Sequence, residues 1–140
     1  MDNATTPRDF DLVIVGASFA GAACAIAAAQ RGLRVCVLER KRDPGEKLHT
    51  TGIIVKEAAE HTLLNRVPAS MTRRIEEVRL YAPSLKQVAL AAPGYYFLTT
   101  DTPAVMRWLA GQMRAHGVDL RLGCAFSAAT RTAGVSVVRK

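Results

Sequence analysis

The segment from Asp11 to Arg40 constrains the fold more than any other part of this chain: DLVIVGASFAGAACAIAAAQRGLRVCVLER. It joins an apolar run, a turn of small residues, an alanine-rich stretch and a second apolar run that ends at Glu39. Short unbroken apolar runs are typical of strands that are buried on both faces of a parallel sheet. The pattern predicts strands at 11–15 and 34–38, with a helix at 19–31 between them.

Four residues of this segment have separate roles in a nucleotide-binding turn. Gly16 allows a sharp turn out of the first strand, because only glycine adopts positive φ freely. Ser18 stands at the middle glycine position of the G-x-G-x-x-G pattern, where its hydroxyl can donate to a phosphate oxygen, and Gly21 allows close helix packing. The amides and dipole at the helix start favour an anion, and Glu39 can accept hydrogen bonds from ribose hydroxyls. Because all parts occur at the expected spacing, the sequence predicts a dinucleotide site rather than a turn that only joins a strand to a buried helix.

The charges after the second strand leave the identity of the dinucleotide open. The Glu39 carboxylate disfavours a ribose 2′-phosphate, because two anions repel each other. Arg40, Lys41 and Arg42 can offset this repulsion. Charge alone therefore does not separate FAD from NAD or NADP.

The composition is that of one globular domain, with 140 residues, 49% of them hydrophobic and 22% charged. The net charge is +7, but the basic residues are scattered, which argues against a nucleic-acid partner. The three cysteines have no metal-ligand spacing; we expect Cys24 and Cys36 to be buried and the protein to be cytoplasmic. Although the stretch from Leu12 to Ala29 is uncharged, glycines interrupt it and acidic residues precede it, so two elements explain it better than a membrane span.

The rest of the sequence predicts a mixture of helices and short strands. Asp101, Thr102 and Pro103 have the form of a helix start. The expected helices are 55–64 and 104–116. The expected strands are 77–82, 87–91, a third at 95–99, then 118–122 and a hairpin of 126–128 with 135–138, turning around Gly134.

Three motifs resemble one family of flavoproteins. They are GASFAG with Glu39 and Arg40, PGEKLHTTG at 44–52, and a weaker match over 95–123. Together they resemble FAD-dependent oxidoreductases of the geranylgeranyl reductase branch, which share a scaffold with aromatic-ring hydroxylases of the p-hydroxybenzoate hydroxylase type. The resemblance implies an α/β fold: a Rossmann-like FAD-binding domain of the glutathione-reductase type over residues 1–140. Within it we expect a βαβ unit at about 10–64, inserted antiparallel strands at about 75–100 and a helix–strand return at about 103–140.

The resemblance also implies a set of cofactor-binding residues, but no catalytic residue, and we expect no metal site. The residues implied for the FAD pyrophosphate are Gly16, Ala17, Ser18, Ala20 and Gly21. Those implied for the adenosine ribose are Glu39 and Arg40, and those near the flavin are Thr51 and Gly52. Phe126 is implied to pack beside the adenine.

The function implied is flavin-dependent oxidation or reduction of a small molecule, with NAD(P)H as the electron donor. Thr51 stands where polyprenyl-reducing members usually have Cys, so an aromatic or polyketide monooxygenase or a halogenase stays an alternative. The substrate class, hydrophobic or not, and peripheral membrane contact stay open. In this family a later Gly-Asp segment completes the flavin site, and nothing after Phe126 supplies it. We therefore expect an incomplete, amino-terminal portion of such an enzyme, with a non-catalytic remnant as a further alternative.

Overall fold

The computed structural model describes residues 9–132 and 135–139, and the side chains up to residue 130. The chain divides into two compact units, Met1–Glu46 with Met106–Lys140, and Lys47–Val105.

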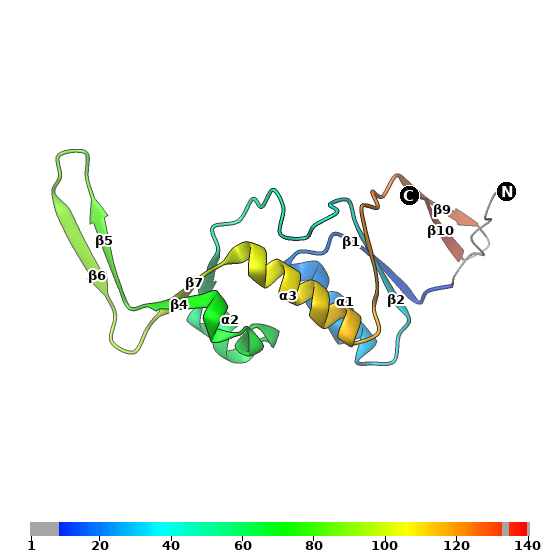
Figure 1. Cartoon of the computed structure of the whole chain (residues 1–140), viewed down its shortest axis with the longest axis horizontal. Coiled ribbons are helices and arrows are strands. Elements are labelled where there is room, and N and C mark those ends of the chain that lie inside the picture. The colour runs from blue at the N-terminus through cyan, green and yellow to red at the C-terminus, as the bar shows by residue number, and fades with distance from the viewer. Residues whose placement is uncertain (1–8, 133–134, 140) are drawn as a thin grey trace. The chain divides into compact units, whose positions relative to one another are not determined.

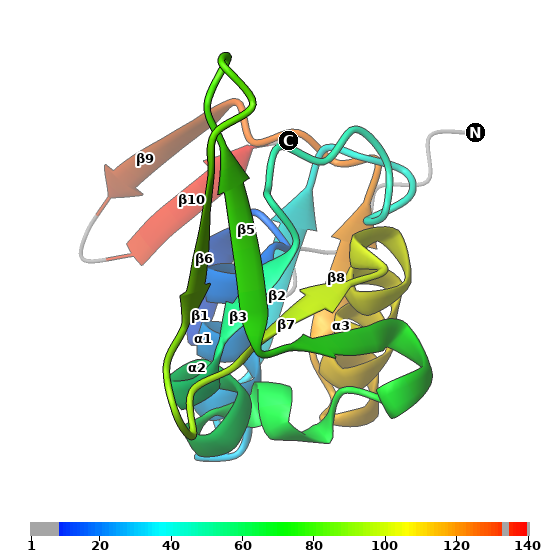
Figure 2. The same cartoon turned by 90° about the vertical axis from the view of Figure 1, so that its left-hand side faces the viewer.

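A parallel three-stranded sheet forms the centre of the first unit. Its strands are β1 (Leu12–Val15), β2 (Val35–Glu39) and β8 (Asp119–Leu122), in the order β1-β2-β8 (Figure 2). Ile14 pairs with Val37, which in turn pairs with Leu120. The central strand is the most deeply buried, with Val35 to Leu38 all inside the core. The α/β fold class and the three strands are therefore confirmed, with boundaries within one residue of those expected.

Two helices pack beside this sheet, α1 (Phe19–Ala29) and α3 (Thr102–Ala115), of which the part from Met106 belongs to this unit. Figure 1 shows them next to each other, and Gln30 Nε2 lies 3.3 Å from His116 Nε2 at their carboxyl ends. The buried residues of α1 are mainly alanines, whereas those of α3 in this unit are mainly longer apolar residues: Ala22, Ala25, Ile26 and Ala28 of α1, and Met106, Leu109, Ala110 and Met113 of α3.

The cysteines correct one expectation. Cys36 is buried in β2, as expected, and burial raises the pKa of its thiol. Cys24 is exposed, because it lies on the face of α1 opposite to Ala22 and Ala25, turned away from the sheet. The prediction that Cys24 is buried was wrong.

An antiparallel sheet organises the second unit. Its strands β3 (Ile53–Val55), β7 (Phe97–Thr100) and β4 (Thr72–Ile75) lie in the order β3-β7-β4. Helix α2 (Lys56–His61) follows β3 directly, and short 3₁₀ turns cover Leu63–Arg66 and Ala69–Met71. Tyr96 fastens α2 to this sheet: its hydroxyl donates to Glu60 Oε1 over 2.9 Å, and the Arg74 guanidinium lies 3.9 Å above its ring. Strands β3 and β4 were not expected, because their segments, IIV and TRRI, show neither a longer apolar run nor a clear alternation of apolar and polar residues.

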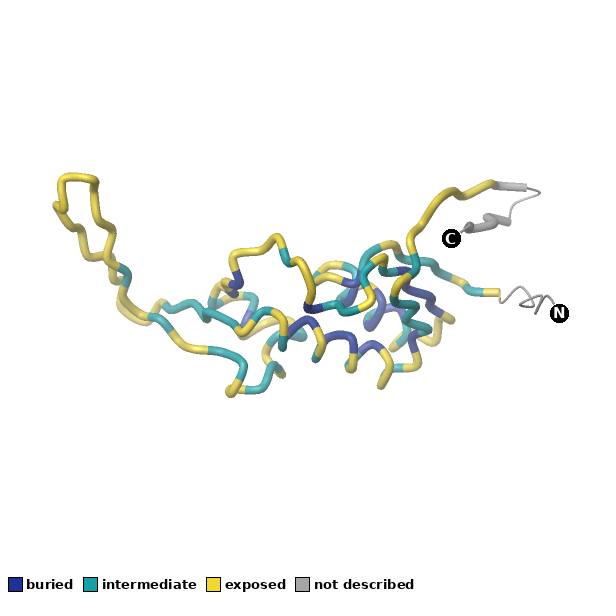
Figure 3. The backbone as a smooth tube through the Cα atoms, turned by 45° about the horizontal axis from the view of Figure 1, so that its top comes forward, coloured by how far each residue is buried: buried dark blue, intermediate teal, exposed yellow. Residues whose placement is uncertain are grey.

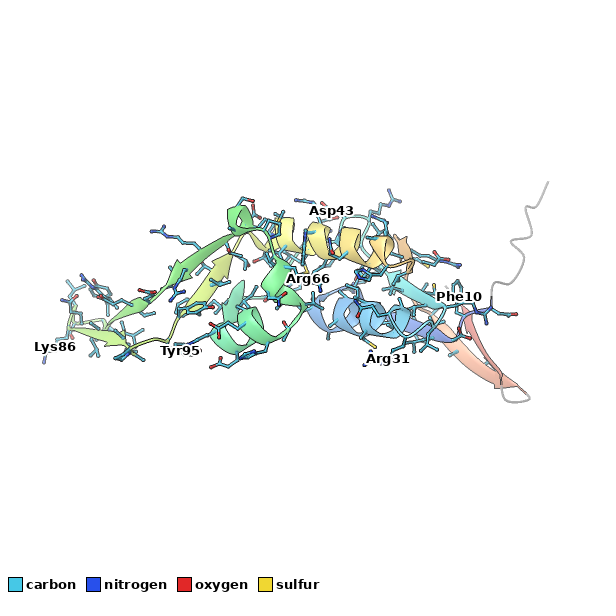
Figure 4. All side chains as sticks on the ribbon, turned by 90° about the horizontal axis from the view of Figure 1, so that it is seen from below. Phe10, Arg31, Asp43, Arg66, Lys86 and Tyr95 are labelled. Carbon is cyan, nitrogen blue, oxygen red and sulfur yellow. The ribbon has the colours of Figure 1, made fainter. Side chains whose placement is uncertain are left out.

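A two-stranded ribbon of β5 (Glu77–Tyr81) and β6 (Gln87–Ala91) completes the second unit. Val78 pairs with Leu90 and Leu80 with Val88, so one face of the ribbon is apolar. The ribbon is exposed along almost its whole length (Figure 3), and Lys86 marks its tip (Figure 4). Both strands were expected, and the third expected strand, at 95–99, is confirmed as β7, which pairs with β3 and β4 rather than with the ribbon.

A hairpin ends the described chain, with β9 (Ala128–Thr132) antiparallel to β10 (Val135–Arg139). An antiparallel hairpin was expected here and is present, but its first strand lies at Ala128–Thr132 and not at 126–128. Gly134, expected at its turn, lies outside the described residues. Across 9–132 and 135–139, none of the helices has the length and apolar character that a membrane crossing requires.

Candidate cofactor site

Two glycines shape the turn between β1 and α1. Gly16 has a φ of +99°, which side-chain-bearing residues rarely adopt. Gly21 has an ordinary backbone conformation, but a Cβ atom placed on it would clash with the carbonyl oxygen of Gly16 and lie 3.6 Å from Ile14 Cγ2. The first turn of α1 therefore lies directly against the backbone of the glycine turn, as the dinucleotide pattern requires.

The start of α1 is open to an anion. Ser18 precedes the helix, is exposed and makes no capping hydrogen bond, and the first turn of α1 contains no acidic residue. The first intrahelical bond runs from Ala22 N to Ser18 O over 2.8 Å, so the amides before it have no partner within the helix. Ala20 is exposed on this turn, whereas Ala17 is buried beneath it. This arrangement of amides suits a phosphate group.

Glu39 connects the glycine turn to the loop that follows β2. Its Oε2 accepts from the Ala17 amide and its Oε1 from the Lys41 amide, each over 2.9 Å. Gly16 N also donates to Leu38 O over 2.8 Å. Each carboxylate oxygen can accept a second hydrogen bond. Glu39 can thus hold a ribose hydroxyl while it holds the turn in place.

The basic loop after Glu39 lies along the residues that follow β8. Gly123 N donates to Lys41 O over 2.8 Å, and Cys124 N donates to Glu39 O over 2.9 Å. Arg40 and Arg42 are exposed, so their charges are available to an anionic ligand. Phe126, two residues beyond Cys124, is 42% exposed, and its ring is open to stacking.

An ion pair that sequence reasoning did not find anchors the same loop to α3. Arg107 donates to both carboxylate oxygens of Asp43, with NH2 at 2.7 Å from Oδ2 and Nε at 3.0 Å from Oδ1. Figure 4 shows Asp43 beside α3. Arg107, and then the Gly45 amide that donates to Oδ1 over 2.9 Å, lower the pKa of Asp43 below its ordinary value. An aspartate before Pro-Gly is a turn signal that could have indicated Asp43; no local signal identifies Arg107 as its partner.

The residues implied for the flavin side, Thr51 and Gly52, belong to the second unit and differ in exposure. Gly52 is buried with a φ of +68°, and its carbonyl oxygen accepts from Thr100, whereas Thr51 is exposed. Sequence reasoning did not identify Thr100 or Thr102 as neighbours of Gly52, because their contacts cross about fifty residues of chain. Among the described residues there is no cluster of His, Cys, Asp and Glu that could hold a metal ion.

The parallel sheet, the glycine turn and the carboxylate at the end of β2 define a dinucleotide-binding domain of the Rossmann type. The model of the family "FAD dependent oxidoreductase" matches residues 11–91. The chain belongs to this family, which confirms the resemblance drawn from the motifs and supports FAD as the cofactor.

Individual relatives agree with this assignment. The chain is 29% identical over 114 residues to digeranylgeranylglycerophospholipid reductase 2 of Methanopyrus kandleri, covering 81% of this chain and 28% of that protein. The structure of a geranylgeranyl bacteriochlorophyll reductase-like protein from Thermoplasma acidophilum is similar with a TM-score of 0.78 at 19% identity, covering 91% of this chain and 33% of that one. PqsL, a probable FAD-dependent monooxygenase of Pseudomonas aeruginosa, gives a TM-score of 0.68 at 20% identity, covering 89% and 35%. The chain therefore spans about a third or less of each of these proteins.

Proposed function

We propose that this chain binds FAD and forms the FAD-binding portion of a flavin-dependent oxidoreductase. One observation carries the proposal. The Glu39 carboxylate meets the glycine turn, through the Ala17 amide, beside the uncapped start of α1. A diphosphate with an adjoining ribose needs these two groups, amide donors and a carboxylate acceptor, at one edge of a parallel sheet.

The described residues fit the adenosine and pyrophosphate portions of FAD. Gly16, Ala17, Ser18, Ala20 and Gly21 would hold the pyrophosphate, Glu39 and Arg40 the ribose, and Phe126 the adenine. Thr51 and Gly52 are proposed for the flavin side. When bound, FAD would supply the electron-transfer chemistry; the residues of this chain would bind and orient it.

We further propose that NAD(P)H is the electron donor and that the substrate is an unsaturated, hydrophobic small molecule. The similarity to a reductase whose name states a digeranylgeranyl lipid supports this choice. A flavin monooxygenase is the second candidate, supported by the similarity of fold to PqsL. We also propose a cytoplasmic location, which the three free cysteines favour.

Titration of the purified chain with FAD tests the proposal. We expect quenching of the flavin fluorescence and a saturable visible absorbance that remains with the protein through gel filtration. Anaerobic bleaching by NAD(P)H would then support the electron donor, and rapid peroxide release in air would favour the monooxygenase over the reductase. A chain that stays colourless and leaves FAD fluorescence unchanged would contradict FAD binding and favour a non-catalytic remnant.

A further inference from the structure

Three threonine hydroxyls surround the Gly52 turn in the second unit. Thr100 donates to the Gly52 carbonyl oxygen twice, from its amide over 2.9 Å and from its hydroxyl over 3.0 Å. The hydroxyls of Thr100 and Thr102 lie 2.9 Å apart. The Gly52 amide lies 3.4 Å from Thr50 Oγ1. The amide and the carbonyl oxygen of Gly52 thus both lie close to threonine hydroxyls.

The direction of the hydroxyl chain follows from a count of hydrogens. A threonine hydroxyl has one hydrogen to donate. When the Thr100 hydrogen is directed to the Gly52 carbonyl oxygen, the hydrogen between the two hydroxyls is that of Thr102, whose Oγ1 also lies 3.5 Å from the Thr100 carbonyl oxygen. The chain runs from Thr102 through Thr100 to Gly52, and removal of the Thr102 hydroxyl weakens both links.

The same hydroxyl, together with the positive φ of residue 52, explains why that residue is glycine. A Cβ atom at Gly52 would clash with Thr102 Oγ1 and lie 3.2 Å from Thr100 Oγ1. Gly52 is buried by these contacts, whereas the neighbouring Thr51 is exposed. The two residues that the sequence motif combined therefore differ in the structure: Gly52 is buried and anchored, whereas Thr51 is open to solvent.

We propose that Thr100 and Thr102 are positioning residues for the flavin side of the cofactor site, acting by holding the Gly52 peptide so that Thr51 faces the flavin. The inference rests on the proposed FAD binding. A purely structural role is the alternative, because hydroxyl-to-carbonyl bonds also stabilise sheets. Thr99 provides the matched control: it lies on the same strand, but its hydroxyl donates to Arg73 O of β4 over 3.3 Å and not to the Gly52 carbonyl oxygen.

The experiment compares Thr102→Val, Thr102→Ser, Thr100→Val and Thr99→Val in the full chain. For each variant it measures the unfolding temperature, the FAD dissociation constant and the visible spectrum of bound FAD. Valine keeps the shape of threonine and removes the hydroxyl, and serine keeps the hydroxyl. We expect Thr102→Val and Thr100→Val to weaken FAD binding about fivefold to tenfold, as the loss of a buried hydrogen bond allows, and to shift the visible flavin bands.

Thr102→Ser should stay within about twofold of the unsubstituted chain, because it retains the donor. Thr99→Val should lower the unfolding temperature without changing the affinity or the spectrum. The inference is overturned if Thr102→Val and Thr100→Val change the affinity and the spectrum no more than Thr99→Val does. If Thr102→Val fails to fold, the comparison of Thr100→Val with Thr99→Val decides the outcome. No FAD binding by the unsubstituted chain would instead refute the proposed function, and this inference with it.

Discussion

Neither Gly21 nor Gly52 has room for a Cβ atom, but a different kind of atom occupies that space at each position. The carbonyl oxygen of Gly16, a backbone atom, blocks a side chain at Gly21, whereas the hydroxyl of Thr102 blocks one at Gly52. The main chain cannot move away without loss of the turn, but a side chain can be replaced. The turn at Gly21 is therefore fixed by the backbone itself, whereas at Gly52 side chains that another sequence could exchange add to a backbone hydrogen bond and a positive φ.

The largest effect is expected for Gly21→Ala. Its Cβ would overlap the Gly16 carbonyl, so we expect a loss of about 3 kcal/mol in the free energy of unfolding, the upper part of the range for overpacking, together with loss of FAD binding. Urea denaturation measures the first quantity. Gly111→Ala is the matched control, because Gly111 lies within α3 with open space around its Cα. That change should stabilise the protein by about 0.5–1 kcal/mol. Equal effects at the two positions would contradict the close approach of α1 to the turn.

A smaller effect is expected for Gly52→Ala, about 2 kcal/mol, from the positive φ and the contact with Thr102 together. Gly94→Ala isolates the first contribution, because Gly94 has a φ of +74° with nothing near a Cβ; its cost should be about 1 kcal/mol. In the double variant Gly52→Ala/Thr102→Ala the cost should fall toward the Gly94 value. A double variant that is no more stable than an additive sum would show that the hydroxyl does not crowd Gly52.

Glu39→Gln should act mainly on the cofactor. A glutamine offers one acceptor oxygen where the carboxylate offers two, so either the Ala17 or the Lys41 amide loses its partner and faces an NH₂ group. We expect the dissociation constant for FAD to rise about tenfold, which corresponds to about 1.4 kcal/mol. Fluorescence titration measures it, with Glu77→Gln on the exposed ribbon as the control. Unchanged affinity would remove Glu39 from the cofactor site.

The smallest effect is expected at the Asp43–Arg107 pair, which is exposed to solvent. Because Arg107 lowers the pKa of Asp43 below its ordinary value of 3.8, the pair contributes stability above that value and loses it as the pH falls through the lower pKa of the folded state. Arg107→Met should therefore lower the unfolding temperature at pH 6 slightly and reduce its decline below pH 4. Arg79→Met, which removes the ion pair with Glu77 on the ribbon, should leave the contribution of Asp43 intact. An identical acid profile in Arg107→Met and the unsubstituted chain would argue against the pair.

The first unit was predictable because its information is local. The apolar runs, the spacing from Gly16 to Gly21 and the acid at Glu39 lie within thirty residues, and each reports a requirement of the βαβ unit. The second unit was less predictable. Strands β3 and β4 are short, and β7 pairs with strands that are distant in the sequence, as Thr99 does with Ile53. Cys24 shows a related limit, since an alanine-rich helix gives little indication of which face is buried.

The residues of the candidate site also differ in how far the sequence could predict them. The sequence motifs indicated Gly52 but not the hydroxyls that make it glycine, because Thr100 and Thr102 follow it by about fifty residues. The ion pair of Arg107 could likewise not be predicted, since no sequence pattern identifies the partner of an exposed arginine on a helix.

Amide chemical-shift mapping of the isotope-labelled chain during FAD titration tests the central claim most directly. If the start of α1 and Glu39 hold the cofactor, the largest shifts should fall on the amides of Ala17, Ser18, Phe19, Ala20, Gly21 and Lys41, while the amides of the β5–β6 ribbon stay in place. Saturable shifts confined to other residues, or no shifts at millimolar FAD, would contradict the account.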